Sequence, residues 1–376
     1  MKNLIGHWFP TVADYPEGRL LSLDVLRGLD MLLLIVVSRL VRATQKGWDC
    51  FSPGFMRQFA HGWEGFTLWD IIMPLFIFMC GAAVPFALGR RLKEGPLAYW
   101  RHVFGRVLLL WFLGCLLQGN LAELDLMKFT PYSNTLQAIA VGYLATAAMM
   151  YVPSRAFAFA LPVFLAVAYA VLLAVGGGYG QWDNFAFRVD HAILRTLLPE
   201  GNPFTLAAPP NHYTWFLTSL MFASMTMCGY HATCILRRDG LPWRKAVALF
   251  ALGGILLALG WGVSPWVPVI KPIFTLSFTA QAMGWCVLAL AVLYVLTDIL
   301  KLRKGLPLVL LYGQNALAVY FIAGFFGGAI QSVVMSCCSG MIRLCGAAGP
   351  LVQAVAFCCV LTAIVTVWRR LKQGRR

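Results

Sequence analysis

The chain is organised around residues 59–74, FAHGWEGFTLWDIIMP, in which a histidine in a short polar segment leads directly into an apolar helix. The apolar run continues to about Leu88, and roughly 20 apolar residues are enough to cross a bilayer as a helix. We therefore expect His61 to lie at the mouth of a membrane-embedded bundle, where water meets hydrocarbon. Imidazole is the side chain best suited to proton transfer or transient acyl carriage near neutral pH.

The composition predicts an all-α polytopic membrane protein. Of 376 residues, 60% are hydrophobic and 12% are charged, whereas about 25% charged residues is usual for a soluble domain. The first 20 residues hold no apolar run followed by a cleavage site, so we expect no removable signal peptide. The apolar runs predict about ten spans (ten or eleven) in a single domain of residues 1–376. These spans are 21–40, 66–88, 102–119, 134–152, 156–175, 213–236, 244–262, 273–298, 307–334 and 350–368.

The positions of the basic residues predict the orientation. With the N-terminus in the cytoplasm, 20 of the 30 Lys and Arg residues fall in cytoplasmic segments, as the positive-inside rule requires. The cytoplasmic segments then include residues 1–20 and the basic tail 369–376, and residues 176–212 form the longest outer loop. We expect a bacterial inner membrane protein with both termini cytoplasmic. The net charge of +15 then needs no nucleic-acid partner.

Cysteine and histidine spacing gives no support for a metal site. The eleven cysteines form no Cys-x-x-Cys pair, and no His-x-x-x-His appears. Four cysteines fall in predicted outer loops, where an oxidising compartment would permit a disulfide. They are Cys50, Cys337, Cys338 and Cys345.

Ionisable residues near the inner end of the first span point toward the bundle interior. Asp24 and Arg27 lie one helical turn apart and can pair. Ser38 continues roughly the same face toward the outer end. That face could line a channel from the cytoplasm to His61. The alternative is a structural ion pair that ties the first helix to its neighbours.

Asp70 has two interpretations. Thr67-Leu68-Trp69-Asp70 has the pattern of a capping box, with Thr67 at the N-cap and the acid three residues later. Alternatively, Asp70 orients His61 or stabilises its cation, as the acid of an acyl-transfer triad does. Trp63 is typical of an aromatic residue at the membrane interface, with contact to a ligand as the alternative.

Other polar residues mark candidate substrate contacts. Asn134 and Gln137 begin the fourth span, where their amides could bind a substrate carbonyl or join helices, which is the commoner role. His212, at the start of the sixth span, is a second candidate base, and Asn315 interrupts the apolar ninth span.

With these residues in view, the chain resembles the heparan-α-glucosaminide N-acetyltransferase family of transmembrane acyltransferases, including its bacterial branch. The resemblance rests on RLLSLDVLRG at 19–28 and on HGWEGFT at 61–67 followed by Asp70 and Pro74. Weaker matches are TLQAIA at 135–140 and GQNALAVY at 313–320. It extends over most of the chain and is specific in the first 90 residues.

The resemblance implies an enzyme that takes acetyl from cytoplasmic acetyl-CoA and delivers it across the membrane to an amino sugar. The family's active histidine falls on His61. Its partner asparagine falls on Ser38, and the arginine expected after Leu-Gln is replaced by Ala138, so the sequence departs from the family at both positions. An amide's geometry cannot be reproduced by serine, which bears on the acceptor or the mechanism.

The phosphates of CoA would favour basic side chains on the cytoplasmic side. The candidates are Arg90, Arg91, Arg237 and Arg238, with Asp24 and Arg27 further along the cofactor path. The acceptor would be a sugar amine or hydroxyl of a glycan, and the other partners we expect are membrane lipid and, as an open possibility, a second copy in a homodimer. Covalent acetyl-histidine and direct transfer both stay open. A transporter or flippase for a sugar or lipid-linked intermediate is the alternative function, because buried charges also line permeation paths.

Overall fold

The computed structural model describes residues 20–118, 120–205 and 215–373. It divides into two compact units, and each is described by itself: unit 1 is Met1–Ala60 with Val292–Arg376, and unit 2 is His61–Ala291. Within the described residues the secondary structure is helical, with one isolated bridge between Glu64 and Ile270. The predicted all-α class is confirmed. The single-domain organisation stays a prediction.

Six helices in the described part of the chain are long and apolar enough to cross a membrane. They are Leu68–Leu88, Pro96–Leu117, Arg155–Val175, Pro242–Val263, Leu276–Ile299 and Gly346–Lys372. A bent pair, Pro307–Gln314 with Ala316–Phe325, would make a seventh. A helical membrane protein is therefore supported, whereas the expected count of about ten is not confirmed. The predicted span 307–334 is broken, because its helix ends at Gln314 and resumes at Ala316 with a bend of 78°.

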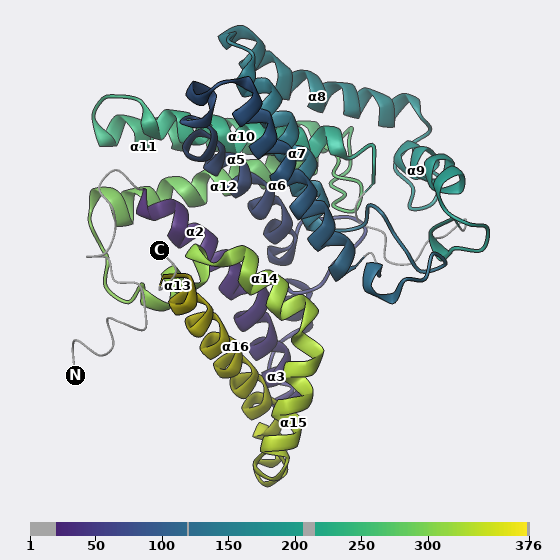
Figure 1. Ribbon diagram of the computed structural model, residues 1–376, viewed down its shortest axis with the longest axis vertical. Coiled ribbons are helices and arrows are strands. Elements are labelled where there is room, and N and C mark those ends of the chain that lie inside the picture. The colour runs from purple at the N-terminus through teal and green to yellow at the C-terminus, as the bar shows by residue number, and fades with distance from the viewer. Residues whose placement is uncertain (1–19, 119, 206–214, 374–376) are drawn as a thin grey trace. The chain divides into compact units, whose positions relative to one another are not determined.

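In unit 2, α5 (Ile72–Leu88) lies beside α10 (Ser219–Arg237) and α7 (Thr135–Tyr151) (Figure 1). A Cβ added at Gly81 would lie 1.7 Å from the carbonyl oxygen of Thr226, so only glycine permits this backbone approach. Thr233 Oγ1 donates to the carbonyl of Ala82 at 3.0 Å. Further along both helices, Arg237 donates to the carbonyl of Pro85. The two helices therefore run parallel, and their C-terminal ends lie together.

Unit 2 also contains the helices α6 (Pro96–Leu117), α8 (Arg155–Val175), α11 (Pro242–Val263) and α12 (Leu276–Leu293). The predicted outer loop 176–212 is not a plain loop, because α9 (Phe185–Leu197) forms inside it. The side chain of Asn184 caps this helix by accepting from the Phe187 backbone at 2.9 Å. Only one face of α9 is buried, so the segment lacks the long apolar run by which the other helices were predicted.

In unit 1, a continuous helix consists of α2 (Leu21–Met31), a π-helical segment η2 (Leu32–Val37) and α3 (Ser38–Trp48). The carboxylate of Asp298, in the π-helical segment η7 (Tyr294–Ile299), caps its N-terminus. It accepts from the backbone nitrogens of Leu21 and Ser22 at 3.1 and 3.0 Å. The first helix is thus fixed by a residue about 280 positions later in the chain.

Unit 1 also contains the short helix α4 (Pro53–Arg57) and the helices α13 (Pro307–Gln314), α14 (Ala316–Phe325), α15 (Gly327–Leu344) and α16 (Gly349–Gln373). α13 packs against α2, and α16 lies beside both α15 and α3 (Figure 1). Cys337 and Cys338 lie within α15 and not in a loop, which corrects their predicted setting. All eleven cysteines fall in the described residues and are free thiols.

Candidate functional site

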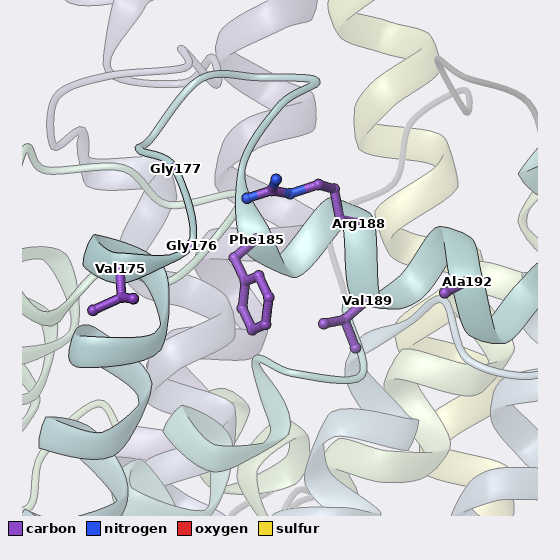
Figure 2. A pocket seen from close by; sticks show the side chains of 7 residues that line it. All are labelled: Val175, Gly176, Gly177, Phe185, Arg188, Val189 and Ala192. Carbon is purple, nitrogen blue, oxygen red and sulfur yellow. The ribbon is translucent and has the colours of Figure 1, made fainter.

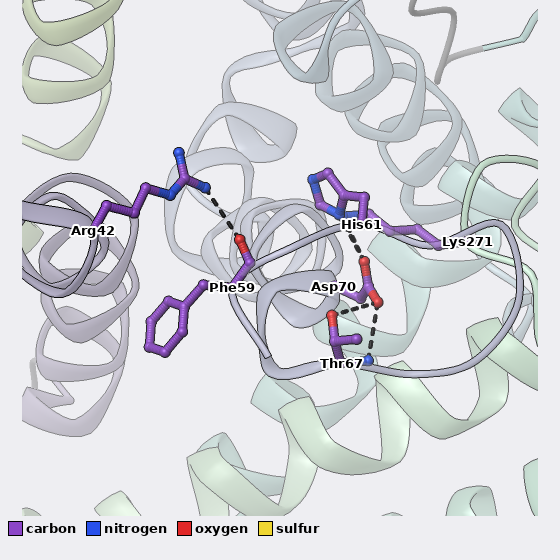
Figure 3. A network of polar contacts seen from close by, with 6 residues as sticks. All are labelled: Arg42, Phe59, His61, Thr67, Asp70 and Lys271. Atoms are coloured by element: carbon purple, nitrogen blue, oxygen red, sulfur yellow. Dashed lines mark hydrogen bonds and ion pairs between the residues drawn. The ribbon is translucent and has the colours of Figure 1, made fainter. Parts of the chain in front are cut away.

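His61 and Asp70 form a hydrogen-bonded pair at the N-terminal end of α5 (Figure 3). The Nδ1 atom of His61 lies 2.9 Å from Oδ1 of Asp70. The Asp70 side chain is 3% exposed, whereas 53% of the His61 side chain is open to its surroundings. The two residues proposed from the sequence as a catalytic pair are therefore in contact, with the acid buried behind an accessible ring.

Asp70 also closes a capping box, on its other oxygen. The backbone nitrogen and the hydroxyl of Thr67 donate to Oδ2 at 2.9 and 2.7 Å, at the start of the 3₁₀ turn Leu68–Ile71 that leads into α5. The predicted capping box is confirmed. Because Thr67 uses Oδ2 and His61 uses Oδ1, the two interpretations of Asp70 are compatible: the carboxylate begins the helix and holds the imidazole at once.

Lys271 is a third member of the site that the sequence reasoning did not assign to it. Its Nζ lies 3.2 Å from Oδ1 of Asp70 and 3.2 Å from Nδ1 of His61, and its side chain is 11% exposed. Burial lowers the pKa of Lys271, an effect that the Asp70 carboxylate opposes. A basic residue beside Pro272 at a helix start was visible in the sequence, but nothing local connects it to a histidine 210 residues away.

Backbone contacts fix the loop that carries Lys271. The nitrogen of Gly65 donates to the carbonyl of Val269 at 2.8 Å, which joins this loop to the His61 segment. The indole nitrogen of Trp215 donates to the carbonyl of Pro272 at 2.8 Å. These bonds flank Lys271 on both sides, so its position beside the pair is built into the backbone.

The contacts determine which nitrogen of His61 can react. An ionised Asp70 only accepts hydrogen bonds, so Nδ1 carries the proton and donates it to Oδ1. Nε2 then bears the free lone pair, in a side chain that is 53% exposed. An imidazole in this tautomer can take a proton from a substrate or attack a carbonyl carbon.

The four arginines predicted to bind the cofactor lie at the other end of α5 and α10. They are Arg90, Arg91, Arg237 and Arg238. Arg237 donates to the carbonyl of Pro85 at 3.0 Å, and its guanidinium lies 5.2 Å from the ring centre of Phe86. Arg90 and Arg91 both pair with Glu94, at 3.4 and 3.3 Å. The 17 residues of α5 correspond to about 25 Å along the helix axis between these arginines and Asp70.

Asn134 and Gln137 hydrogen-bond within the helical bundle. Both are fully buried and form a capping box at the start of α7. Asn134 Nδ2 donates to the carbonyl of Gly114 at 2.5 Å, and Gln137 Nε2 donates to the carbonyl of Pro131 at 2.9 Å. Their amides therefore cap one helix and join it to the next, as the structural alternative held.

Four predicted site residues belong to unit 1: Asp24, Arg27, Ser38 and Asn315. Asp24 and Arg27 form the expected ion pair, with Oδ1 and Nη1 at 3.3 Å. Ser38 is buried and donates to the carbonyl of Leu34 in its own helix at 2.6 Å.

Asn315 lies at the break between α13 and α14, where its Nδ2 donates to the Leu311 carbonyl at 2.9 Å. Arg42, drawn in Figure 3, belongs to this unit as well and donates to the carbonyl of Phe59 at 3.1 Å. Of the other candidates, Trp63 is half-buried in unit 2, and His212 lies outside the described residues.

A hollow of about 550 Å³ opens between the end of α8 and the start of α9 (Figure 2). Its lining residues are Val175, Gly176, Gly177, Phe185, Arg188, Val189 and Ala192. Arg188 is exposed and extends toward the glycine turn, so a single cation lies beside an otherwise apolar and glycine-rich surface (Figure 2). α8 runs antiparallel to α10, since His231 meets Ala158 and Ser224 meets Pro162. The hollow therefore lies at the same end of unit 2 as His61.

A comparison with known protein families matches part of the chain. Residues 19–122 match the family described as "Domain of unknown function (DUF5009)". The matched stretch includes His61 and Asp70 but ends well before Lys271. No curated protein matches the chain.

Proposed function

We propose that the protein is an integral membrane acyltransferase that moves acetyl from cytoplasmic acetyl-CoA to an amino or hydroxyl group of a glucosamine-like sugar on the outer side. The observation that carries the proposal is the His61–Asp70 hydrogen bond, which leaves Nε2 of an accessible imidazole free to act as base or acyl carrier. The resemblance of residues 19–28 and 61–67 to heparan-α-glucosaminide N-acetyltransferases supports this class of reaction.

The chemistry follows from the tautomer. In direct transfer, Nε2 takes the proton of the acceptor N–H or O–H while the acceptor nitrogen or oxygen attacks the thioester carbonyl. The C–S bond then breaks, and the CoA thiolate leaves and recovers the proton from the imidazolium. Asp70 stabilises the transient cation through its hydrogen bond to Nδ1. In the covalent route Nε2 itself attacks the thioester carbonyl, the C–S bond breaks, and CoA leaves as a thiolate. The acceptor nitrogen or oxygen then attacks the acetyl group on the ring, the N–C bond to Nε2 breaks, and the acceptor's proton passes through the released Nε2 to the thiolate.

The arginines at the other end of α5 suit the phosphates of the donor. Arg238 and Arg90 are exposed, and guanidinium groups bind phosphate bidentately. A pantetheine arm is long, thin and only modestly polar, so it suits a slot between helices. The nucleotide would stay at the basic end while the thioester extends toward His61.

The hollow beside α9 is the proposed docking surface for the acceptor sugar. It lies at the same end of unit 2 as His61, and it offers a guanidinium at Arg188 together with the ring of Phe185. Sugar rings present apolar faces that pack on aromatic side chains, and their hydroxyls accept hydrogen bonds from guanidinium groups.

One observation favours the transporter alternative. The helices α13 and α14 are separated by Asn315 and bent by 78°, and discontinuous helices often surround the substrate sites of transporters. Such a protein would have no need to bind acetyl-CoA.

The test is thioester cleavage by the purified protein in detergent, followed as release of the free CoA thiol with and without glucosamine. We expect cleavage in the wild type and its loss in His61→Ala. His231→Gln is the matched control, because glutamine can still donate to the Ala158 carbonyl that His231 contacts. Full activity in His61→Ala excludes the mechanism. If acetyl-CoA also leaves the melting temperature unchanged, the transporter is favoured, since a ligand that binds the native state stabilises it.

A further inference from the structure

Three ionisable side chains converge at the site, and the third has no part in the chemistry above. The Nζ of Lys271 contacts both Oδ1 of Asp70 and Nδ1 of His61, each at 3.2 Å. The indole of Trp69 also lies near the ring, with its centre 6.4 Å from that of the imidazole. The nearest acid along the chain, Glu64, is exposed. Among the residues that the structure describes, the charged groups in contact with His61 are therefore one anion, Asp70, and one cation, Lys271.

We infer that Lys271 is a positioning residue that keeps His61 neutral while Asp70 holds the ring proton on Nδ1, so that Nε2 stays available as a base. This inference rests on the proposed function for its purpose, but its physical content concerns the imidazole alone. The positive charge of Lys271 opposes the effect of the Asp70 carboxylate, which by itself favours a doubly protonated ring.

The geometry gives Lys271 this effect for two reasons. A cation 3.2 Å from Nδ1 repels the positive charge that the neutral ring would acquire on protonation at Nε2. The ammonium also shares Oδ1 with the Nδ1–H group, so it competes for the oxygen that would stabilise the imidazolium. Because Lys271 is only 11% exposed, solvent screens this repulsion weakly.

A purely structural ion pair between Lys271 and Asp70 makes a different prediction. Both interpretations predict lower stability when Lys271 is replaced. Only the positioning role predicts that the titration of His61 moves, and that it moves in opposite directions when the cation and the anion are removed in turn.

The experiment is an NMR titration of the full-length protein in detergent micelles, with ¹³C-labelled histidine. The His61 signal is assigned as the one missing from His61→Ala. In Lys271→Met we expect the His61 signal to titrate at a higher pH than in the wild type, because the repelling cation is gone. In Asp70→Asn the midpoint of the His61 titration should fall, and in Lys271→Arg, which keeps the cation, it should stay near the wild-type value.

If Lys271→Met does not fold, Lys271→Gln takes its place, because glutamine can still donate to Asp70 without carrying charge. An unchanged His61 midpoint in the charge-neutral variant overturns the inference, whatever the enzyme activity. Should thioester cleavage also be measurable, the acidic limb of its pH profile must move with the NMR midpoint. A moved midpoint without any cleavage in the wild type would uphold the inference and reject the acyltransferase.

Discussion

Replacing Asp70 by asparagine is expected to destabilise the protein mainly through Lys271. The carboxylate is 3% exposed and pairs with an ammonium that is itself only 11% exposed. Removing one partner of a buried ion pair costs about 3–5 kcal/mol, because the other charge is left uncompensated. Asparagine keeps an oxygen that can accept from the Thr67 backbone, so part of the helix cap survives. We therefore expect a loss of about 3 kcal/mol in the free energy of unfolding at pH 6.

The loss should shrink as the pH rises. Burial lowers the pKa of Lys271 and Asp70 opposes that effect, so without the carboxylate the pKa falls further. The unfolded lysine titrates near pH 10.4. Above the lowered pKa the native variant has released the proton while its unfolded state still binds it, so stability rises with pH. The difference in the free energy of unfolding between Asp70→Asn and the wild type therefore narrows as the pH rises from the native pKa of Lys271 in the variant to its native pKa in the wild type.

The assay is thermal unfolding in detergent at pH 6 to 9.5, with all variants heated at one rate. Glu64→Gln is the matched control, because it removes an exposed carboxylate six residues away and should change stability by less than about 0.5 kcal/mol. Adding Lys271→Met to Asp70→Asn should recover part of the loss, because the orphaned cation is gone. Equal melting of Asp70→Asn and Glu64→Gln, or strictly additive losses in the double variant, would refute the reasoning.

Three further changes test other parts of the structure. His61→Ala should lower the rate of acetyl transfer about 10²- to 10⁴-fold. Because the ring is 53% exposed, the same change should alter the free energy of unfolding by less than about 0.5 kcal/mol. The transfer rate and the thermal melting curve of the variant are measured together. Gly81→Ala should cost about 1–3 kcal/mol or prevent folding, because the new Cβ meets a backbone oxygen at 1.7 Å; Gly254→Ala, with open space at its Cβ, is the control, and equal melting temperatures would contradict the packing of α5 on α10. Arg188→Ala should raise the acceptor KM about fivefold at unchanged kcat, because the loss of one hydrogen bond costs about 1 kcal/mol. Arg195→Ala, on the same helix, is the control and should leave the KM unchanged. Equal KM values in Arg188→Ala and the wild type would show that the acceptor does not bind in this hollow.

Local patterns carried the predictions that succeeded. The helix after Thr67, its capping box and the Asp24–Arg27 pair each depend on residues within one or two turns, where periodicity and side-chain reach are decisive. The interpretation of Asp70 was left open between cap and orienting acid, because a sequence does not show that the two oxygens of one carboxylate can serve two partners.

The missed features are those that depend on distant segments or on a single buried face. Lys271 reaches His61 only because a loop 210 residues later is hydrogen-bonded to the His61 segment. For Asn134 the sequence leaves open a substrate contact or a bond between helices, and the bond to the Gly114 carbonyl becomes visible only in the folded chain. Helix α9 was missed because its polar outer face interrupts the apolar run.

The cap that Asp298 places on α2 has a consequence for biosynthesis. Residues 61–291 form a continuous compact unit, whereas the other unit joins the first 60 residues to the last 85. During translation the nitrogens of Leu21 and Ser22 must wait, while nearly 280 intervening residues leave the ribosome, for the carboxylate that binds them. Helix α2 is therefore synthesised early but receives its cap late. A chain released before residue 298 keeps an uncapped α2, which quality-control proteases can recognise.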